Sequence, residues 1–304
     1  MSTTEYTTAE QLNQAASSQP ATNQAAEAAT RGTSQPSPDA TPVQGELARF
    51  RLDGRVAVVS GGTGGIGRRL SKALAGVGAR VAVLGRTAKD ATELASEIEQ
   101  LGGEALLVAC DVTRREDANR AIDEVMERFG RVDIIINAVG GGAGTALYPA
   151  EEYPEDEFDR IMDLNLRSDL LPTQAAARAM IKGGRGGRVL HISSVRGQLG
   201  INQGFSAYVA AKGAINSLTR QQATEWAKHG ITVNAISPTF VATPQAESLL
   251  ADEDFKKGLL ARIPLGRVAD PDDLVGAVLF FCSDASSFVT GQILTLDGGL
   301  TATQ

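Results

Sequence analysis

The sequence predicts an α/β protein with a doubly wound parallel β-sheet, and three observations support this fold class. About seven apolar segments of strand length recur along the chain. Longer segments with helical periodicity lie between them. The strand segments are continuous runs of Val, Ile, Ala and Leu, which is typical of parallel sheets covered by helices on both faces. We therefore expect right-handed crossovers between neighbouring strands.

The expected elements alternate from residue 56 to the end of the chain. This regular order predicts one Rossmann-type domain, residues 46–304, and no second domain. Residues 239–265, in the longest interval without a strand, are expected to form a lid over the substrate. The expected strands are 56–60, 81–84, 105–109, 132–137, 189–193, 232–237 and 293–296, and the clearest helices are 67–78, 90–101, 115–129, 208–228 and 271–282.

Residues 1–45 differ in composition from the rest of the chain. They are rich in Ala, Thr, Ser, Gln and Pro, and Leu12 and Val43 are the only large aliphatic residues after Met1. Such a segment buries too little apolar surface to offset the entropy lost on ordering, so we expect a disordered N-terminal extension. It has neither the basic start and apolar core of a signal peptide nor the arginine-rich pattern of a mitochondrial presequence. A tail that binds a partner is the alternative.

Charge, cysteines and histidines exclude several classes of function. The chain has 304 residues and a formal net charge of −7, so we expect neither nucleic acid nor an anionic membrane as a partner. No apolar run approaches the roughly 20 residues of a spanning helix. Cys110 and Cys282 lie far apart without metal-ligand spacing, which predicts no metal site and a reducing, cytoplasmic location. His191 shows no pattern of a Ser-His-Asp triad and is expected in the core or at the edge of a cleft.

A glycine-rich turn joins the first expected strand to the first helix. Gly61, Gly65 and Gly67 lie in the segment G-G-T-G-G-I-G, which also contains Thr63 and Ile66. Glycines let the backbone approach a pyrophosphate, and the following helix offers free N–H groups and a partial positive charge. We therefore expect this turn to bind a dinucleotide, and a purely structural turn is the alternative.

The spacing G-x-x-x-G-x-G, preceded here by Ser60, resembles the TGxxxGxG motif of the classical short-chain dehydrogenase/reductase family. Further motifs follow in the order of the family and extend the resemblance from about residue 50 to residue 304. The resemblance implies an NAD(P)-dependent oxidoreductase. Within the family, the pattern is similar to gluconate and deoxygluconate dehydrogenases and to 3-oxoacyl reductases.

The end of the second expected strand indicates which cofactor is used. An Asp or Glu there favours NAD, because it accepts hydrogen bonds from the ribose hydroxyls. Here Gly85 occupies the acidic position and Arg86 follows. A guanidinium pairs well with a phosphate and stacks on adenine, so NADP is expected. NAD is the alternative, with Arg86 as a solvated surface residue. In addition, Gly64 stands where NADP-using relatives often have a basic residue.

The resemblance implies further contacts with the cofactor. Asp111 and Val112 follow the third strand, where the family uses the Asp to bind adenine. Asn137 and Gly140 match part of an NNAG motif and are expected near the cofactor, although Asn137 is expected mainly to tie strands together. The remaining contacts are implied by a segment similar to P-G-x-x-x-T, in which this chain has Pro238, Val241 and Thr243.

Two titratable residues, Tyr208 and Lys212, are four residues apart, which places them on one face of a helix. Ser194 lies fourteen residues upstream of Tyr208, at the end of the fifth expected strand. Ligands of open α/β sheets bind at this end of the strands. The charge of Lys212, together with the positive nicotinamide ring, is expected to lower the pKa of Tyr208 from about 10 toward the range in which a general acid–base group works best. A surface pair is the alternative.

The resemblance assigns a catalytic role to four residues. Tyr208 is the general acid and base, and Lys212 assists it and also binds the nicotinamide ribose. Ser194 binds the substrate oxygen, and Asn165 anchors a water that relays protons to Lys212. Ser193 competes with Ser194 for its role, and the V-x-G pattern after Ser194 favours the second serine. The interval from Ser194 to Tyr208 is one residue longer than usual.

These motifs predict hydride transfer between a nicotinamide and the carbonyl or secondary alcohol of a small, polar substrate. Segments 140–145 and 196–204 are expected to line the substrate site. A non-catalytic dinucleotide sensor or scaffold on the same fold is the main alternative, and a Rossmann-like methyltransferase is a third. The resemblance also implies a homotetramer or homodimer built from helices at about 151–182 and 208–228, with the C-terminal strand at a second interface.

Overall fold

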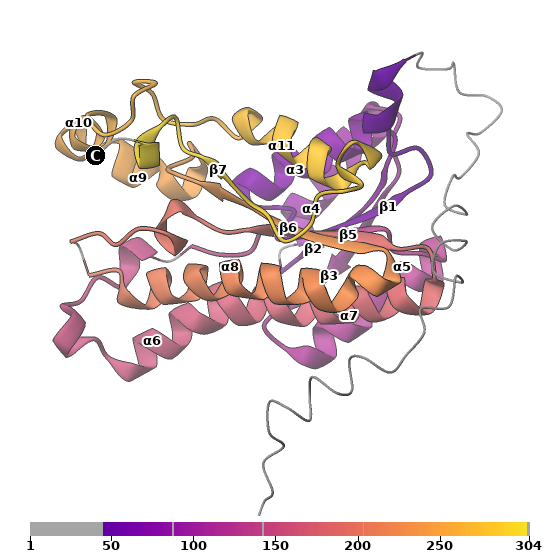
Figure 1. The fold of residues 1–304 in the computed structure, drawn as a ribbon, viewed down its shortest axis with the longest axis horizontal. Helices are drawn as coiled ribbons and strands as arrows, with labels where there is room; N and C mark the ends of the chain where they lie inside the picture. Colours follow the sequence, from indigo (N-terminus) through magenta and orange to yellow (C-terminus); the bar gives the residue numbers. More distant parts are fainter. Residues whose placement is uncertain (1–44, 87, 142, 203, 303–304) are drawn as a thin grey trace, which may run out of the picture. The chain divides into compact units, whose positions relative to one another are not determined.

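The computed structural model describes residues 45–86, 88–141, 143–202 and 204–302, which lie in one compact unit (Figure 1). The predicted disordered extension, residues 1–45, lies outside the described residues except for Gly45. The fold therefore concerns the predicted dinucleotide-binding domain. No helix in these ranges is long and apolar enough to cross a membrane.

Seven parallel strands form one sheet in the order β3-β2-β1-β4-β5-β6-β7, which confirms the predicted fold class. The strand order reverses between β1 and β4, and α/β proteins of this kind bind ligands at such a point. Every predicted strand matches an observed one to within two residues at each end. The observed strands are β1 (Val56–Ser60), β2 (Arg80–Gly85), β3 (Ala105–Ala109), β4 (Ile134–Asn137), β5 (Gly187–Ile192), β6 (Ile231–Pro238) and β7 (Ile293–Leu296).

The continuous apolar runs are explained by burial of both faces of the sheet. In β1, Ala57 and Val59 belong to one apolar cluster, whereas Val56 and Val58 belong to a second cluster. Successive side chains of a strand point to opposite faces, so each face has its own core. All four side chains are fully buried. A strand covered on both sides therefore needs apolar residues at every position.

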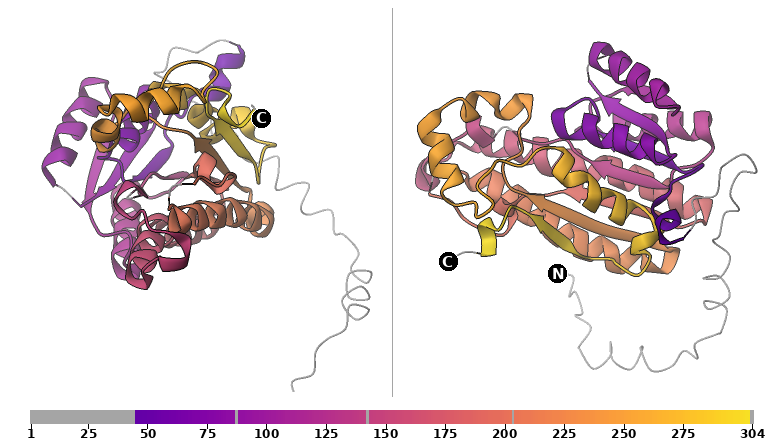
Figure 2. Two further views of the ribbon diagram at one scale, coloured as in Figure 1. Left: turned by 90° about the vertical axis from the view of Figure 1, so that its left-hand side faces the viewer. Right: turned by 90° about the horizontal axis from the view of Figure 1, so that it is seen from above.

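Helices cover both faces of the sheet. Figure 1 shows α3, α4 and α11 on one face and α7 and α8 on the other, and Figure 2 gives two further views of these layers. A π-helical turn, Asp163–Arg167, joins α6 to α7. The helices are α3 (Gly65–Gly76), α4 (Ala88–Gln100), α5 (Arg115–Phe129), α6 (Glu155–Met162), α7 (Ser168–Gly183), α8 (Ser206–Trp226), α9 (Glu247–Leu250), α10 (Glu253–Leu260) and α11 (Asp272–Cys282).

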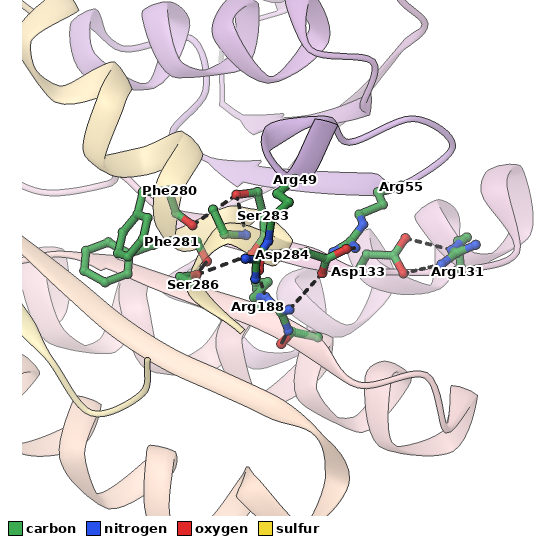
Figure 3. Close-up of polar contacts among 12 residues, drawn as sticks. Arg49, Arg55, Arg131, Asp133, Arg188, Phe280, Phe281, Ser283, Asp284 and Ser286 are labelled. Atoms are coloured by element: carbon green, nitrogen blue, oxygen red, sulfur yellow. Dashed lines mark hydrogen bonds and ion pairs between the residues drawn. The ribbon is translucent and has the colours of Figure 1, made fainter. Parts of the chain in front are cut away.

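An arginine-rich network fastens the amino edge of the sheet (Figure 3). Asp284, in the short helix Asp284–Ser286 after α11, accepts ion pairs from Arg55 at 2.5 Å and from Arg188 of β5 at 3.2 Å. The Arg49 side chain, in the short helix Glu46–Phe50, donates to the backbone oxygen of Asp284 at 3.2 Å. Beside it, the Asp133 carboxylate accepts from the backbone N–H of β1 at 2.8 Å and from Arg131. Segments far apart in the sequence are thereby joined where the strands begin.

Candidate active site

A cleft of about 910 Å³ lies at the carboxyl edge of the sheet, which is the opposite edge from this network. Its volume is typical of sites for small molecules and cofactors. Residues at or directly after the ends of six strands line it: Gly61, Gly85, Cys110, Ala138, Ser193 and Pro238. The segment between β6 and β7 lines the remaining side with residues from Phe240 to Arg262. This is the region in which the sequence predicts a lid.

The glycine-rich turn forms the floor of one end of the cleft. Gly61 has a φ of +74°, a conformation that side chains disfavour. A Cβ atom on Gly65 would lie 2.7 Å from the Cβ of Thr243, so only glycine lets this segment pack against Thr243. Helix α3 begins at Gly65 after Gly64, and no side chain caps it. Its first N–H groups are therefore free of a side-chain partner at the place where a phosphate would lie.

Gly67 has a different role from the other motif glycines, because it does not line the cleft. A Cβ atom there would collide with the carbonyl oxygen of Gly61. This glycine permits the close approach of α3 to the end of β1, and its predicted contact with the cofactor stays a prediction.

The end of β2 presents Gly85 and Arg86 to the cleft, as the sequence predicts. A Cβ atom on Gly85 would lie 3.0 Å from the hydroxyl oxygen of Thr63, so a carboxylate side chain at this position would have to displace Thr63. Arg86 is exposed, and its charge acts on Asp111 across the cleft. Hydrogen bonds from Thr113 chiefly, and the charge of Arg86 in addition, lower the pKa of Asp111. The carboxylate of Asp111 is therefore ionised at neutral pH.

Asn137 does not line the cleft, and its predicted contact with the cofactor stays a prediction. Its side chain is buried and donates to the Thr173 hydroxyl of α7 at 2.6 Å. It also lies 3.4 Å from the Nδ1 atom of His191. Asn137 thus connects β4 to α7 and to β5, in line with the structural role that was expected to be its main one.

His191 is fully buried in β5 and has partners that the sequence did not reveal. Its Nδ1 atom forms an ion pair with Asp169 of α7 at 2.6 Å, and its Nε2 atom lies 3.0 Å from the Gln222 side chain of α8. Burial lowers the pKa of His191, but Asp169 and Gln222 outweigh it and raise the pKa overall. This network is internal and adds no group to the cleft.

Tyr208 and Lys212 face the cleft from the first turns of α8. The Lys212 ammonium lies 5.7 Å from the centre of the Tyr208 ring. It donates to the carbonyl oxygen of Ile192, at the end of β5, at 2.8 Å. Lys212 is only 4% exposed, so this hydrogen bond fixes a nearly buried charge at one place. The predicted pair is therefore a feature of the cleft and not of the surface.

The two candidate serines have different surroundings. The Ser193 hydroxyl donates to the Asn216 side chain at 2.7 Å and is held inside the protein. The Ser194 hydroxyl forms a hydrogen bond with Tyr208 and accepts from the backbone N–H of Arg196 at 3.1 Å. Of the two, Ser194 is thus the serine that stands beside Tyr208. The longer interval between Ser194 and Tyr208 does not separate them.

Asn165 is fully buried in the π-helical turn and does not line the cleft. Its side-chain oxygen accepts from the N–H of Gly141 at 2.9 Å, and its side-chain nitrogen donates to the carbonyl oxygen of Gly141 at 3.0 Å. This paired contact holds the backbone after β4. A Cβ atom on the neighbouring Gly140 would lie 3.3 Å from the Lys212 ammonium, so that backbone lies directly beside the lysine.

The electrostatics of Tyr208 differ from the sequence-based expectation. Burial raises the pKa of Tyr208, and the Ser194 hydrogen bond and the charge of Arg196 oppose this effect. Lys212 is not among the groups that lower it, which corrects the prediction that its charge does so. Burial also lowers the pKa of Lys212 to about 8, against the raising effect of Asp169. The phenol is therefore neutral at pH 7, and most of the lysine remains charged.

Comparisons with known proteins agree with this geometry. The profile of the family described as Enoyl-(Acyl carrier protein) reductase matches residues 61–301. Gluconate 5-dehydrogenase of Gluconobacter oxydans is 38% identical to this chain, with 83% of this chain and 96% of the relative covered. A crystal structure of a short-chain type dehydrogenase/reductase from Mycobacterium marinum is 36% identical, with a TM-score of 0.80 and coverage of 84% and 99%. The chain belongs to the short-chain dehydrogenase/reductase family.

A second solved structure adds a cofactor to the comparison. It is a gluconate 5-dehydrogenase from Burkholderia cenocepacia in complex with NADP and tartrate, 36% identical, with a TM-score of 0.80 and coverage of 85% of this chain and 99% of that one. As a short-chain dehydrogenase/reductase, our protein is an oxidoreductase that transfers hydride between a nicotinamide cofactor and an alcohol or carbonyl carbon. The function class predicted from the sequence is confirmed.

The residues of this short-chain dehydrogenase/reductase fit a dinucleotide. Gly61, Gly64 and Gly140 line the cleft with bare backbone. Cβ atoms added at these positions would lie 3.3 Å or less from neighbouring backbone atoms or from the Lys212 ammonium. The uncapped start of α3 offers N–H groups to a pyrophosphate. Asp111 and Arg86 mark the end of the cleft at which adenine and its ribose would lie.

Several residues that line the substrate end were not singled out from the sequence. They come from loops and from α9 and α10, outside the family motifs, and five of them are apolar. For five of the seven the sequence signal was only their position in segments predicted to form the substrate site or the lid, and Leu147 and Phe205 lie just outside those segments. They are Leu147, Ile201, Phe205, Gln245, Leu249, Phe255 and Arg262.

Proposed function

We propose that the protein is an NADP-dependent dehydrogenase or reductase in which Tyr208 exchanges the proton with the substrate oxygen. The observation that carries the proposal is the convergence of Tyr208, Ser194 and Lys212 in one cleft with the uncapped glycine turn. When bound, the nicotinamide cofactor supplies or accepts the hydride. All other steps belong to side chains of this chain.

Tyr208 is suited to donate a proton to a carbonyl oxygen. Because burial raises its pKa, the phenol carries its proton at neutral pH. The Ser194 hydroxyl is placed to bind the same substrate oxygen and to stabilise the charge that develops on it. In the oxidation direction Tyr208 must first lose its proton, and the charge of Arg196 stabilises its phenolate.

Lys212 and Asn165 support the reacting groups from neighbouring positions. Lys212, held by the Ile192 carbonyl, keeps a charge near the Tyr208 ring and faces the place of the nicotinamide ribose. Asn165 fixes the Gly140–Gly141 backbone beside Lys212 through its two hydrogen bonds to Gly141. We therefore assign Asn165 as a positioning residue and Lys212 as a catalytic one. The water that the family resemblance implies would lie between them.

NADP is the cofactor that the end of β2 favours. Gly85 offers no carboxylate to repel a 2′-phosphate, and the exposed guanidinium of Arg86 is free to pair with it. A gluconate 5-dehydrogenase with 36% identity to this chain holds NADP in its solved structure. The charge of Arg86 also lowers the pKa of Asp111 at this end of the cleft.

The test is the substitution Tyr208→Phe, with Tyr153→Phe as its matched control. The Tyr153 hydroxyl donates to the Ala146 carbonyl at 2.9 Å and does not line the cleft. NADPH-dependent turnover is measured with a panel of ketones and polyols, and NADPH binding is measured by fluorescence. We expect Tyr208→Phe to lose about 10²- to 10⁴-fold in turnover, with NADPH binding retained and Tyr153→Phe close to the wild type. Unchanged turnover in Tyr208→Phe contradicts the proposal.

A non-catalytic dinucleotide sensor is the alternative that the same experiment separates. It predicts that the wild type binds NADPH but turns over no member of the panel. The presence of Tyr208, Ser194 and Lys212 together in the cleft favours the enzyme. A Rossmann-like methyltransferase has no use for the tyrosine–lysine pair.

We also propose a homo-oligomer in the cytoplasm. The edge strand β7 exposes 40% of Leu294, and Phe288 just before it is fully exposed at 101%. Apolar side chains at a sheet edge favour an interface with a second copy of the chain. Both cysteines are buried and free, as expected in a reducing compartment. Light scattering after gel filtration distinguishes monomer, dimer and tetramer.

A further inference from the structure

Two arginines stand at the substrate end of the cleft. Arg196 lies in the short helix Val195–Gly197, two residues after Ser194, and Arg262 follows α10. Both line the cleft together with Tyr208. Burial chiefly, and the like charge of Arg262 in addition, lower the pKa of Arg196. Arg196 is partly buried and Arg262 is exposed, and the like charge of Arg262 acts on Arg196.

No carboxylate compensates these charges within the described part of the chain. The Arg196 guanidinium donates a single hydrogen bond among the described residues, to the carbonyl oxygen of Gly200 at 3.2 Å, and no ion pair joins either arginine to a described residue. The only acidic residue among those lining the cleft is Asp111, at the opposite end beside Arg86. Asp254 borders a neighbouring hollow together with Arg262, but the two form no ion pair.

This arrangement costs folding free energy, because a half-buried charge with a like-charged neighbour is unfavourable unless it is paired. Six other partly buried arginines of the described chain have an acidic partner, as Arg188 has in Asp284, and Arg80 has none. Leu147, Leu249 and Phe255 line the same end of the cleft.

We propose that the substrate carries an oxyanion, a carboxylate or a phosphate, which binds between Arg196 and Arg262 while its carbonyl or alcohol carbon lies at Tyr208. The inference rests on the proposed function and deepens it, since it names the substrate class: an anionic hydroxy or oxo compound. The planar guanidinium matches both oxyanions with paired hydrogen bonds. A neutral analogue of the same shape leaves both arginines without a partner and is discriminated against.

The experiment measures binding without turnover, by calorimetric titration of the NADPH-saturated protein. The probes form two matched pairs: D-gluconate with D-glucitol, and glycerol 3-phosphate with glycerol. In each pair the neutral member differs in the anionic group alone. We expect at least one anion to bind about 10- to 100-fold more tightly than its neutral partner. The pair that shows the difference distinguishes a carboxylate from a phosphate.

Arg196→Gln and Arg262→Gln should each reduce this preference about tenfold, and the double variant should abolish it. Arg196→Lys should keep part of it, because the charge remains while the planar fork is lost. Arg267→Gln is the matched control, since Arg267 is exposed, pairs with Asp273 and does not line the cleft. NADPH affinity and the urea midpoint of each variant show that the domain is folded and that the cofactor end is intact.

The inference is overturned if the wild type binds neither anion more tightly than its neutral partner. It is also overturned if the glutamine variants keep the preference. These results leave the proposed function in place, because Tyr208→Phe tests turnover separately. Conversely, a preserved anion preference with unchanged turnover in Tyr208→Phe would reject the proposed function and keep the anion site.

Discussion

Arginines cluster at both edges of the sheet, but the described part of the chain supplies an acidic partner at only one of them. At the amino edge, Arg55 and Arg188 pair with Asp284, and Arg49 bonds to its backbone. At the carboxyl edge, Arg196 and Arg262 repel each other and have no carboxylate among the described residues. A cluster of arginines is therefore structural where the chain supplies its own counter-charge. It indicates a ligand where the chain does not.

Strand β5 connects these two environments directly. It begins beside Arg188, which is anchored to Asp284, and it ends just before Ser193 and Ser194. A well-anchored start of the strand helps to place the serine at the far end, since catalytic groups need support from a rigid element. The comparison predicts that changes at the amino edge lower stability and changes at the carboxyl edge alter ligand binding.

The largest effect is expected from Asp284→Asn, which removes the counter-charge of the amino edge. The side chains of Arg55 and Arg188 are only 19% and 12% exposed, whereas that of Asp284 is 53% exposed. Breaking a buried pair costs about 3 to 5 kcal/mol and an exposed one about 1 kcal/mol or less. We therefore expect a loss of about 2 kcal/mol in the free energy of unfolding, measured by urea denaturation.

Glu124→Gln is the control for this stability loss, because the pair of Arg120 with Glu124 is exposed on both sides. It should change the free energy of unfolding by no more than about 0.5 kcal/mol. NADPH affinity should stay unchanged in both variants. If Asp284→Asn is fully folded but binds NADPH much more weakly, the amino edge of the sheet influences the cofactor site at the carboxyl edge.

A smaller effect is expected from Arg86→Gln at the cofactor end of the cleft. Its guanidinium would pair with the 2′-phosphate, and a charged hydrogen bond is worth about 1.5 kcal/mol or more. We expect NADPH affinity to fall about tenfold and NADH affinity to stay the same, as measured by fluorescence titration. Equal loss for both cofactors would assign Arg86 to adenine stacking, and no loss for either would make it a solvated surface residue.

The smallest effect concerns pH and the charge of Lys212. Its pKa is about 8, so the rate of carbonyl reduction should fall as the pH rises through this value and the ammonium is lost. The negative Asp169 raises that pKa, and Asp169→Asn should therefore move the alkaline limb of kcat/KM to lower pH by roughly one unit. Asp163→Asn, in an exposed pair with Arg167, should leave the profile unchanged. An unmoved limb in Asp169→Asn would mean that another group controls it.

The strands and the cofactor end of the cleft could be predicted from local sequence. Each strand is a run of apolar residues because both faces of the sheet are covered. Gly61, Gly65 and Arg86 are read from their position at the ends of β1 and β2. The nearness of Tyr208 and Lys212 follows from helical spacing alone.

The remaining features depend on contacts between distant segments. The sequence does not show that burial dominates the pKa of Tyr208, since this depends on what packs over the cleft. Asn137 could not be placed outside the cleft without knowing that Thr173 of α7 lies beside it. Arg262 lies 66 residues beyond Arg196 in the sequence, and only the fold brings them to one site.

Helix α8 carries Tyr208 in its first turn and Trp226, the only tryptophan of the chain, at its last residue. At 1.5 Å per residue these side chains are separated by about 27 Å along the helix axis. Trp226 packs against the core on the face covered by α5 and α7. Its emission thus reports on the integrity of that core, whereas NADPH emission reports on occupancy of the cleft. The protein and its cofactor thus provide two different optical signals, so unfolding and NADPH binding can be followed in one cuvette without labels.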